Sequence, residues 1–151
     1  MPKTCAVFFK KRIFNAAQKE QIVSAIRDAE KLTSGEIKVH VEPKCTGDAM
    51  HRALQIFHQL GIHKTTHKNG VLIYLATEDR RFAVLGDSGI HAKVPANFWD
   101  GTKEVMKAHF KKGELVEGIL FAIRETGSHL AQYFPPSADD KNELSDDISE
   151  G

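Results

Sequence analysis

The sequence predicts an α/β domain in which a mixed β-sheet is sandwiched between helices, in the order α-β-α-β-β-α-α. Residues 36–42 alternate strictly between polar and apolar, and residues 71–76 form a nearly unbroken apolar run of strand length. The segments around them carry apolar residues at helical spacing. A chain of 151 residues, 41% of them hydrophobic, is large enough for one sizeable core, so we expect a single folded domain.

The first expected helix starts after Asn15, a suitable N-cap with Gln18 three residues later, and ends at Ser34. The alternating strand follows. The second helix is expected between its N-cap Asp48 and Gly61. The residues expected to face inward from these two helices are Ile22, Val23, Ile26, Ala29, Leu32, Leu54, Phe57 and Leu60.

The apolar run at residues 71–76 predicts a central strand that is covered on both faces. A short turn at residues 77–80 leads to a third strand at residues 82–85, so these two strands should form an antiparallel hairpin. The first two strands flank a helix and should be parallel. Two more helices are expected, one from near Pro95 and one that stops at Pro135. Their expected inward residues are Phe98, Val105, Met106, Phe110, Leu115, Ile119, Leu120, Ile123, Leu130 and Phe134.

The tail from Ser137 to Gly151 is rich in Asp, Glu and Ser and poor in large apolar residues. This composition predicts a flexible, acidic segment after a domain that spans residues 1–136. The alternative is that Leu144 and Ile148 dock as a short amphipathic turn. The acidic spacing does not match a calcium-binding loop, because Leu144 stands where an oxygen ligand is required.

The charge balance argues against a nucleic-acid-binding protein. Lysine and arginine number 21 and acidic residues 20, so a net charge of +1 provides no large basic field. The apolar run at residues 6–9 is too short for a signal-peptide core or a membrane span, and Cys5 and Cys45 indicate free thiols. We therefore expect a cytoplasmic protein without a membrane anchor.

No motif identifies an enzyme. The signatures of phosphate loops, dinucleotide-binding turns and α/β-hydrolases do not occur in the sequence, and its eight histidines never form HExxH. Residues 86–89 (GDSG) are similar to the nucleophile segment of serine proteases, but those enzymes need a far longer chain and a supporting His and Asp.

Four segments, in the right order, resemble the TPM domain family. Residues 30–37 (EKLTSGEI) resemble the end of its opening helix and its first strand, and residues 69–73 (NGVLI) resemble the entry to its central strand. Residues 79–81 (DRR) resemble its hairpin turn, and residues 86–90 stand where the family has a glycine pair. The resemblance covers roughly residues 14–134.

The resemblance implies an α/β sandwich, divalent-metal binding with calcium in some members, and the weak acid phosphatase activity ascribed to a plant relative. Three departures limit what transfers. Asp87 and Ser88 lie between Gly86 and Gly89, where the family often has one aromatic residue. Leu60 stands where a tryptophan is common, and the export signal and membrane tether of many members have no counterpart.

A candidate metal site follows from the strand directions. Glu36 opens the first strand, and Asp87 follows the third, which the hairpin returns to the same edge of the sheet. Their carboxylates, with Ser88 beside them, would offer oxygen ligands to a hard cation, calcium first and magnesium second. The alternative is that Glu36 faces solvent at a strand start and Asp87 caps a glycine-rich turn.

Two functions stay open. We expect a non-catalytic module that binds a divalent ion or a partner protein and assists the maintenance of other proteins. The alternative is a metal-dependent phosphoester hydrolase in which a metal-bound water attacks. Such an enzyme should supply cations to the developing charge, and Arg80 and Arg81 are expected at the hairpin end, opposite the two carboxylates.

Overall fold

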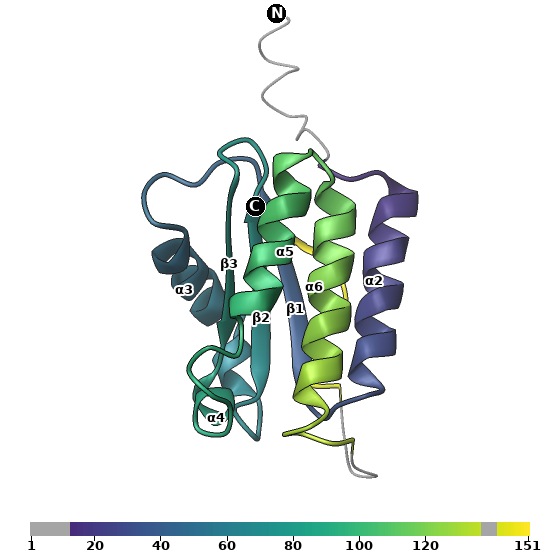
Figure 1. Ribbon diagram of the computed structural model, residues 1–151, viewed down its shortest axis with the longest axis vertical. Helices are drawn as coiled ribbons and strands as arrows, with labels where there is room; N and C mark the ends of the chain where they lie inside the picture. The colour runs from purple at the N-terminus through teal and green to yellow at the C-terminus, as the bar shows by residue number, and fades with distance from the viewer. Residues whose placement is uncertain (1–12, 137–141) are drawn as a thin grey trace, which may run out of the picture.

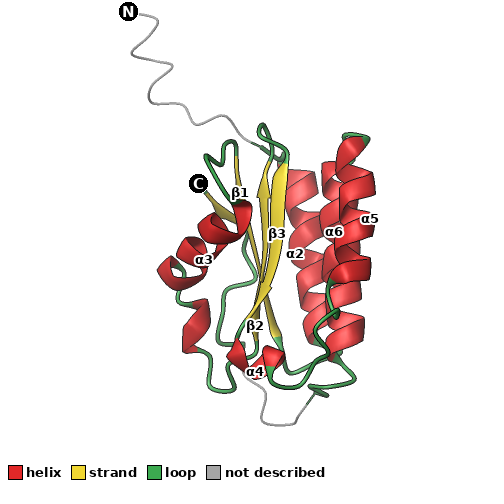
Figure 2. Ribbon diagram, turned by 60° about the vertical axis from the view of Figure 1, so that its left-hand side comes forward, coloured by secondary structure: helices red, strands yellow, loops and turns green. Residues whose placement is uncertain are grey.

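The computed structural model describes residues 13–136 and 142–151, and these residues form a four-stranded sheet with helices on both faces (Figures 1 and 2). The elements in chain order are α2 (Ala16–Glu30), β1 (Glu36–Glu42), α3 (Ala49–Gln59), η1 (Ile62–Lys64), β2 (Gly70–Ala76), β3 (Arg81–Gly86), α4 (Ser88–His91), α5 (Asp100–Lys111), α6 (Leu115–Leu130) and β4 (Ser149–Glu150). The predicted fold class is confirmed. The short helices η1 and α4 and the strand β4 are additions to the predicted elements.

The strand order in the sheet is β3-β2-β1-β4. β1 and β2 are parallel, with Glu36 opposite Gly70, and β2 and β3 form the predicted antiparallel hairpin. β4 pairs parallel to the outer edge of β1, with His40 opposite Ser149. Among the described helices, none is long and apolar enough to cross a membrane.

The central strand β2 is buried along its whole length, as predicted. Figure 2 shows α2, α5 and α6 on one face of the sheet and α3 on the other. Val71, Ile73 and Leu75 belong to the core under the three long helices, whereas Leu72 and Tyr74 belong to the core under α3. Both faces of β2 are therefore covered by apolar packing.

The first helix begins as predicted but ends earlier. Asn15 Oδ1 accepts the backbone N–H of Gln18 at 2.8 Å, and Gln18 returns a bond to the backbone of Asn15, which completes a capping box. The helix ends at Glu30, so Leu32 lies beyond it and is 51% exposed, and its predicted inward position is wrong. The hydroxyl of Thr33 donates to the backbone carbonyl of Phe134 at 2.5 Å and directs the chain into β1.

The structure also differs from the prediction at Leu54, at the start of α5 and at Val105. In α3, Phe57 is buried as predicted, but Leu54 is 47% exposed because the inward face consists of Ala53, Ile56 and Phe57. Helix α5, the third of the predicted helices, begins at Asp100 and not near Pro95, and Val105 on it is 38% exposed.

Residues 142–151, which we call the C-terminal segment, belong to the predicted flexible tail and contact the sheet in the structure. Leu144 packs against the core under α3, and Ile148 packs against the core under α2 and α6, so the docking alternative describes these residues. Lys38 Nζ donates to the carbonyls of Ser145 and Asp147 at 3.2 and 2.9 Å. Lys38, on the polar face of the alternating strand, therefore holds the C-terminal segment by two hydrogen bonds. The predicted tail residues 137–141 lie outside the described part of the chain.

Replacing Leu72 by Ala should lower the free energy of unfolding by about 2 to 5 kcal/mol, because Leu72 is fully buried and its loss leaves a cavity under α3. Urea unfolding measures the change. The matched control is Leu54→Ala, which removes the same atoms from a half-exposed position and should cost far less. A loss below about 1 kcal/mol for Leu72→Ala would contradict the central placement of β2.

Candidate functional site

The predicted metal ligands lie at one end of the sheet, where β1 and β2 begin and β3 ends. Glu36 is opposite Gly70 on β2, and the backbone N–H of Asp87 donates to the carbonyl of the same Gly70 at 3.0 Å. The predicted directions of β1, β2 and β3 are therefore confirmed. β1 and β3 are two strand spacings apart, about 10 Å, whereas two oxygens on one calcium ion lie within about 5 Å of each other.

The side chain of Ile62 lies over the space between the two carboxylates. A Cβ on Gly70 would stand 2.6 Å from Ile62 Cγ2, so Ile62 packs directly on the residue that separates Glu36 from Asp87. Ile62 is fully buried. No group of three His, Cys, Asp or Glu side chains with metal-binding geometry occurs in residues 13–136 and 142–151. The structure thus brings Glu36 and Asp87 to one end of the sheet with an apolar side chain between them.

The Glu36 carboxylate contacts the C-terminal segment. Glu36 Oε1 accepts the backbone N–H of Leu144 at 2.6 Å. Burial raises the pKa of Glu36 above its usual value, and the hydrogen bonds from the backbone of Leu144 and Glu143 oppose that rise. Glu36 is only 4% exposed, so it does not face solvent at the strand start.

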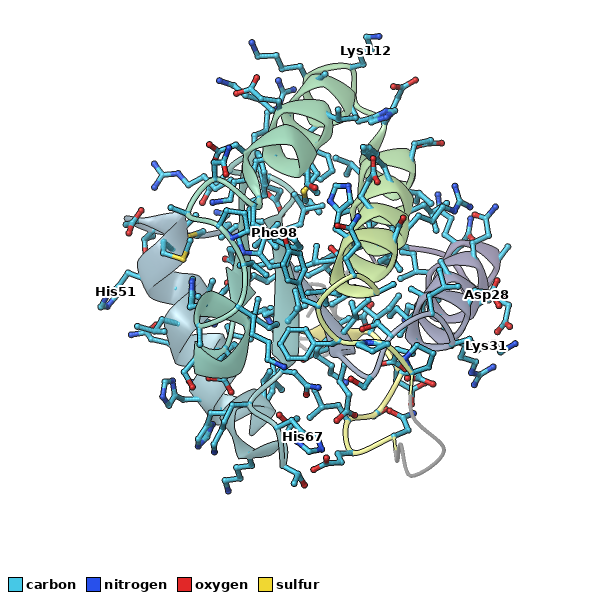
Figure 3. The ribbon with its side chains drawn as sticks, turned by 60° about the horizontal axis from the view of Figure 1, so that its bottom comes forward. Asp28, Lys31, His51, His67, Phe98 and Lys112 are labelled. Atoms are coloured by element: carbon cyan, nitrogen blue, oxygen red, sulfur yellow. The ribbon has the colours of Figure 1, made fainter. Side chains whose placement is uncertain are left out.

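Asp87 is the N-cap of α4 and keeps one oxygen without a partner. Asp87 Oδ1 accepts the backbone N–H of Ser88 at 2.7 Å, whereas Oδ2 is buried and has no hydrogen-bond partner. The backbone carbonyls of His67 and Lys68 lie against Gly89, so close that no Cβ would fit there. Figure 3 views this end of the molecule and shows His67 on the loop before β2. A buried carboxylate oxygen without a hydrogen-bond partner is costly, and carboxylate and carbonyl oxygens are the ligands that a hard cation prefers.

A second polar cluster, which the sequence reasoning did not identify, lies farther along β1. The Glu42 carboxylate accepts bonds from Arg52 Nε at 2.8 Å, from Arg52 Nη2 at 2.9 Å and from the Tyr74 hydroxyl at 2.5 Å. Burial alone would raise the pKa of Glu42, but the hydrogen bonds from Arg52, Tyr74 and His40 outweigh burial and lower the pKa to about 2. Burial and the Glu42 carboxylate raise the pKa of Tyr74.

His40 joins this cluster to the C-terminal segment. Its Nε2 lies 3.1 Å from Glu42 Oε1, and its Nδ1 lies 2.8 Å from the hydroxyl oxygen of Ser149. Burial lowers the pKa of His40, so the ring is neutral at pH 7. The network assigns the ring proton to Nε2, and Nδ1 accepts from Ser149. The polar alternation of Glu36, Lys38, His40 and Glu42 on one strand face was the sequence signal for this network.

The order hydroxyl, imidazole and carboxylate is also the order in acyl-transfer triads, but a triad needs a substrate site and donors for the oxyanion. A pocket of about 430 Å³ at this end of β1 is lined by Glu42, Lys44, Cys45, Thr46, His51, Arg52 and Gln55, and so by neither His40 nor Ser149. His40 is 4% exposed. The contacts of His40 and Ser149 therefore fit a role in holding β4 against β1.

A third cluster joins α2 to the C-terminal segment. Glu30 Oε2 accepts the backbone N–H of Ile37 at 3.0 Å, and the Glu30 carboxyl also hydrogen-bonds to Asp146, which lies 3.6 Å from Arg27 Nε. Burial, followed by the bond to Asp146, raises the pKa of Glu30 to about 9. Two carboxyl groups in contact share one proton at neutral pH.

Replacing Glu30 by Gln should flatten the pH dependence of stability. The folded chain holds a proton on Glu30 that the unfolded chain releases above the ordinary glutamate pKa of 4.5. The stabilising contribution is therefore full below about pH 4.5 and is lost as the pH rises to about 9. Gln keeps the acceptor for Ile37 and has no proton to release.

Urea unfolding between about pH 5 and about pH 9 tests this expectation, with the wild-type chain losing more stability than Glu30→Gln as the pH rises. Glu20→Gln, an exposed change on the same helix, is the matched control and should keep the wild-type slope. Equal slopes for Glu30→Gln and the wild-type chain would contradict the protonated state of Glu30.

Comparison with known proteins identifies the family of this chain. The family model of the TPM domain matches residues 7–128. A solved structure of the BA42 protein from the psychrophilic bacterium Bizionia argentinensis is 43% identical, with a TM-score of 0.88, over 95% of this chain and 99% of that chain. No curated protein matches the chain.

Two more distant structures share the fold. The N-terminal domain of the cg2496 protein from Corynebacterium glutamicum is 15% identical, with a TM-score of 0.62, over 92% of this chain and 80% of that chain. An N-terminal domain from P. gingivalis is 21% identical, with a TM-score of 0.67, over 81% and 79%. The family match and the 43% identity together establish that the chain belongs to the TPM domain family.

Proposed function

We propose that the chain is a non-catalytic binding module of the TPM family. The observation that carries the proposal is the state of its buried carboxylates on the polar face of β1. Glu42 accepts hydrogen bonds from Arg52 and Tyr74, and Glu36 accepts one from Leu144. Carboxylates occupied in this way hold parts of the chain together, and neither is placed to accept a proton from a substrate or a metal-bound water.

The same proposal includes a divalent cation, calcium before magnesium, at the start of α4. Asp87 and Ser88 supply the side-chain oxygens, and the carbonyls of His67 and Lys68 are nearby neutral donors. The buried Oδ2 of Asp87, which has no hydrogen-bond partner, supports this site. Oxygen ligands on a loop suit calcium, and a single carboxylate makes for weak binding. Glu36 is not among these ligands, because its Oε1 is bonded to Leu144.

Calcium titration followed by amide chemical shifts tests the cation site. The expected shifts are confined to residues 67–69 and 86–89, because Asp87 carries the orphaned Oδ2 and the carbonyls of His67 and Lys68 lie against Gly89, two residues after Asp87. Asp87→Asn should abolish the shifts. Asp28→Asn, an exposed change at the same end of the molecule, is the matched control and should retain them (Figure 3). Shifts that cluster at residues 45–48 and 78–79 instead would place the ion at the opposite end of the sheet.

An assay with an aryl phosphate, with and without calcium or magnesium, distinguishes the binding module from the phosphatase alternative. The binding module should give no metal-dependent turnover, because Arg80 and Arg81 lie at the far end of the hairpin from Asp87. Metal-dependent turnover that is lost in Glu36→Gln or Asp87→Asn would establish the hydrolase and overturn the binding module.

A further inference from the structure

The outer edge of β1 forms a binding strip for an extended segment, and the chain's own C-terminal segment lies on it. The backbone N–H of Gly151 donates to the carbonyl of Val41 at 3.0 Å, next to the β4 pairing of His40 with Ser149. Figure 2 shows the end of the chain beside β1, on the same side of the sheet as α3. Addition of a strand to a sheet edge is a common way to bind a peptide, since backbone bonds supply affinity and side-chain contacts supply specificity.

The strip is complementary in charge to an acidic segment. Lys19 Nζ lies 3.1 Å from a carboxylate oxygen of Glu150, and Arg27 Nε lies 3.6 Å from one of Asp146. The backbone N–H of Thr66 donates to the Glu143 carboxylate at 3.1 Å. With Lys38, which donates to two carbonyls of the segment, these donors come from α2, β1 and the loop before β2. They belong to the body of the domain and would face any segment that replaced residues 142–151.

Two apolar contacts fix the position of the segment on the strip. Leu144 reaches the core under α3, and Ile148 reaches the core on the opposite face of the sheet. The segment therefore passes over the edge of the sheet from one core to the other. Both side chains are only partly buried, and the ion pairs of Lys19 and Arg27 are partly exposed. Such contacts are individually weak, so the covalent tether contributes much of the occupancy.

We propose that this strip is the docking site for an acidic, extended segment of a partner protein and that residues 142–151 are its built-in competitor. The inference rests on the proposed binding module and names the class of partner. The partner segment adds parallel to β1, carries apolar residues at the spacing of Leu144 and Ile148, and has acidic residues facing Lys19 and Arg27. When it binds, the C-terminal segment is released.

The test uses a fluorescent peptide with the sequence of residues 142–151 and the full-length chain. Leu144→Ser with Ile148→Ser should loosen the tethered segment and keep its charge, so the peptide should bind this variant at least about 10-fold more tightly than the wild-type chain. Adding Arg27→Ala and Lys38→Ala to the variant should weaken binding. Lys107→Ala, an exposed cation on α5, is the matched control and should leave it unchanged.

The wild-type chain provides a second measurement that does not depend on how the variant folds. Unlabelled peptide, raised above the effective concentration of about 1 mM expected for a short tether, should move the amide signals of residues 144–151 toward those of a released segment. No movement, or no binding by a folded variant, would overturn the docking site. Peptide-free dimers that exchange their C-terminal segments would overturn it in favour of a second copy. Either result would contradict the docking site alone. The proposed non-catalytic function is tested separately, by the absence of metal-dependent phosphatase turnover.

Discussion

The outer half of the sheet depends on one constraint, which is that the polar face and open edge of β1 must be covered. The single helix α3 packs mainly against β3 and β2. Lys38, His40 and Glu42 alternate along β1 and so face one side of the sheet, where Glu42 bonds to Arg52 of α3 and the other two bond to the C-terminal segment. The C-terminal segment covers the remainder, and its backbone bonds also close the edge of β1. An unpaired edge would otherwise remain available for pairing with another chain.

This constraint explains why so many buried polar groups gather on one strand. Each polar side chain of β1 has a partner on another element: Glu36 bonds to Leu144, Lys38 to Ser145, and His40 to Ser149. Unmade hydrogen bonds in buried positions are costly, so the C-terminal segment and the polar face of β1 stabilise each other. The central strand β2 does not depend on the C-terminal segment for coverage, because apolar side chains pack on both of its faces.

The sequence predicted the parts of the fold that local pattern determines. The apolar run of β2, the hairpin and the capping box at Asn15 are local features, and each is found in the structure. Leu32 and Leu54 were placed inward because helical spacing does not say which of two neighbouring faces meets the core. The docking of Ile148 depends on contacts with residues far away in the chain, and composition alone could not predict these contacts for the C-terminal segment.

The candidate site shows the same division. Strand directions correctly brought Glu36 and Asp87 to one end of the sheet, because the parallel pair and the hairpin follow from element order. They could not show that Ile62, from the short helix η1, packs over Gly70 between the two carboxylates. The Glu42 cluster was missed because Arg52 and Tyr74 approach it from other elements. Contacts between side chains from different elements depend on the tertiary structure, which local sequence patterns do not predict.

The central claim is that the C-terminal segment is bound along β1 in the folded chain, and amide hydrogen exchange tests it most directly. Two amides report on the contact: the N–H of Leu144, which donates to the Glu36 carboxylate, and the N–H of Gly151, which donates to the carbonyl of Val41. The account predicts that both exchange at least about 10-fold more slowly than in an unstructured peptide of the same sequence. Exchange of both amides at the unstructured rate, in a chain whose β2 amides remain protected, would contradict it.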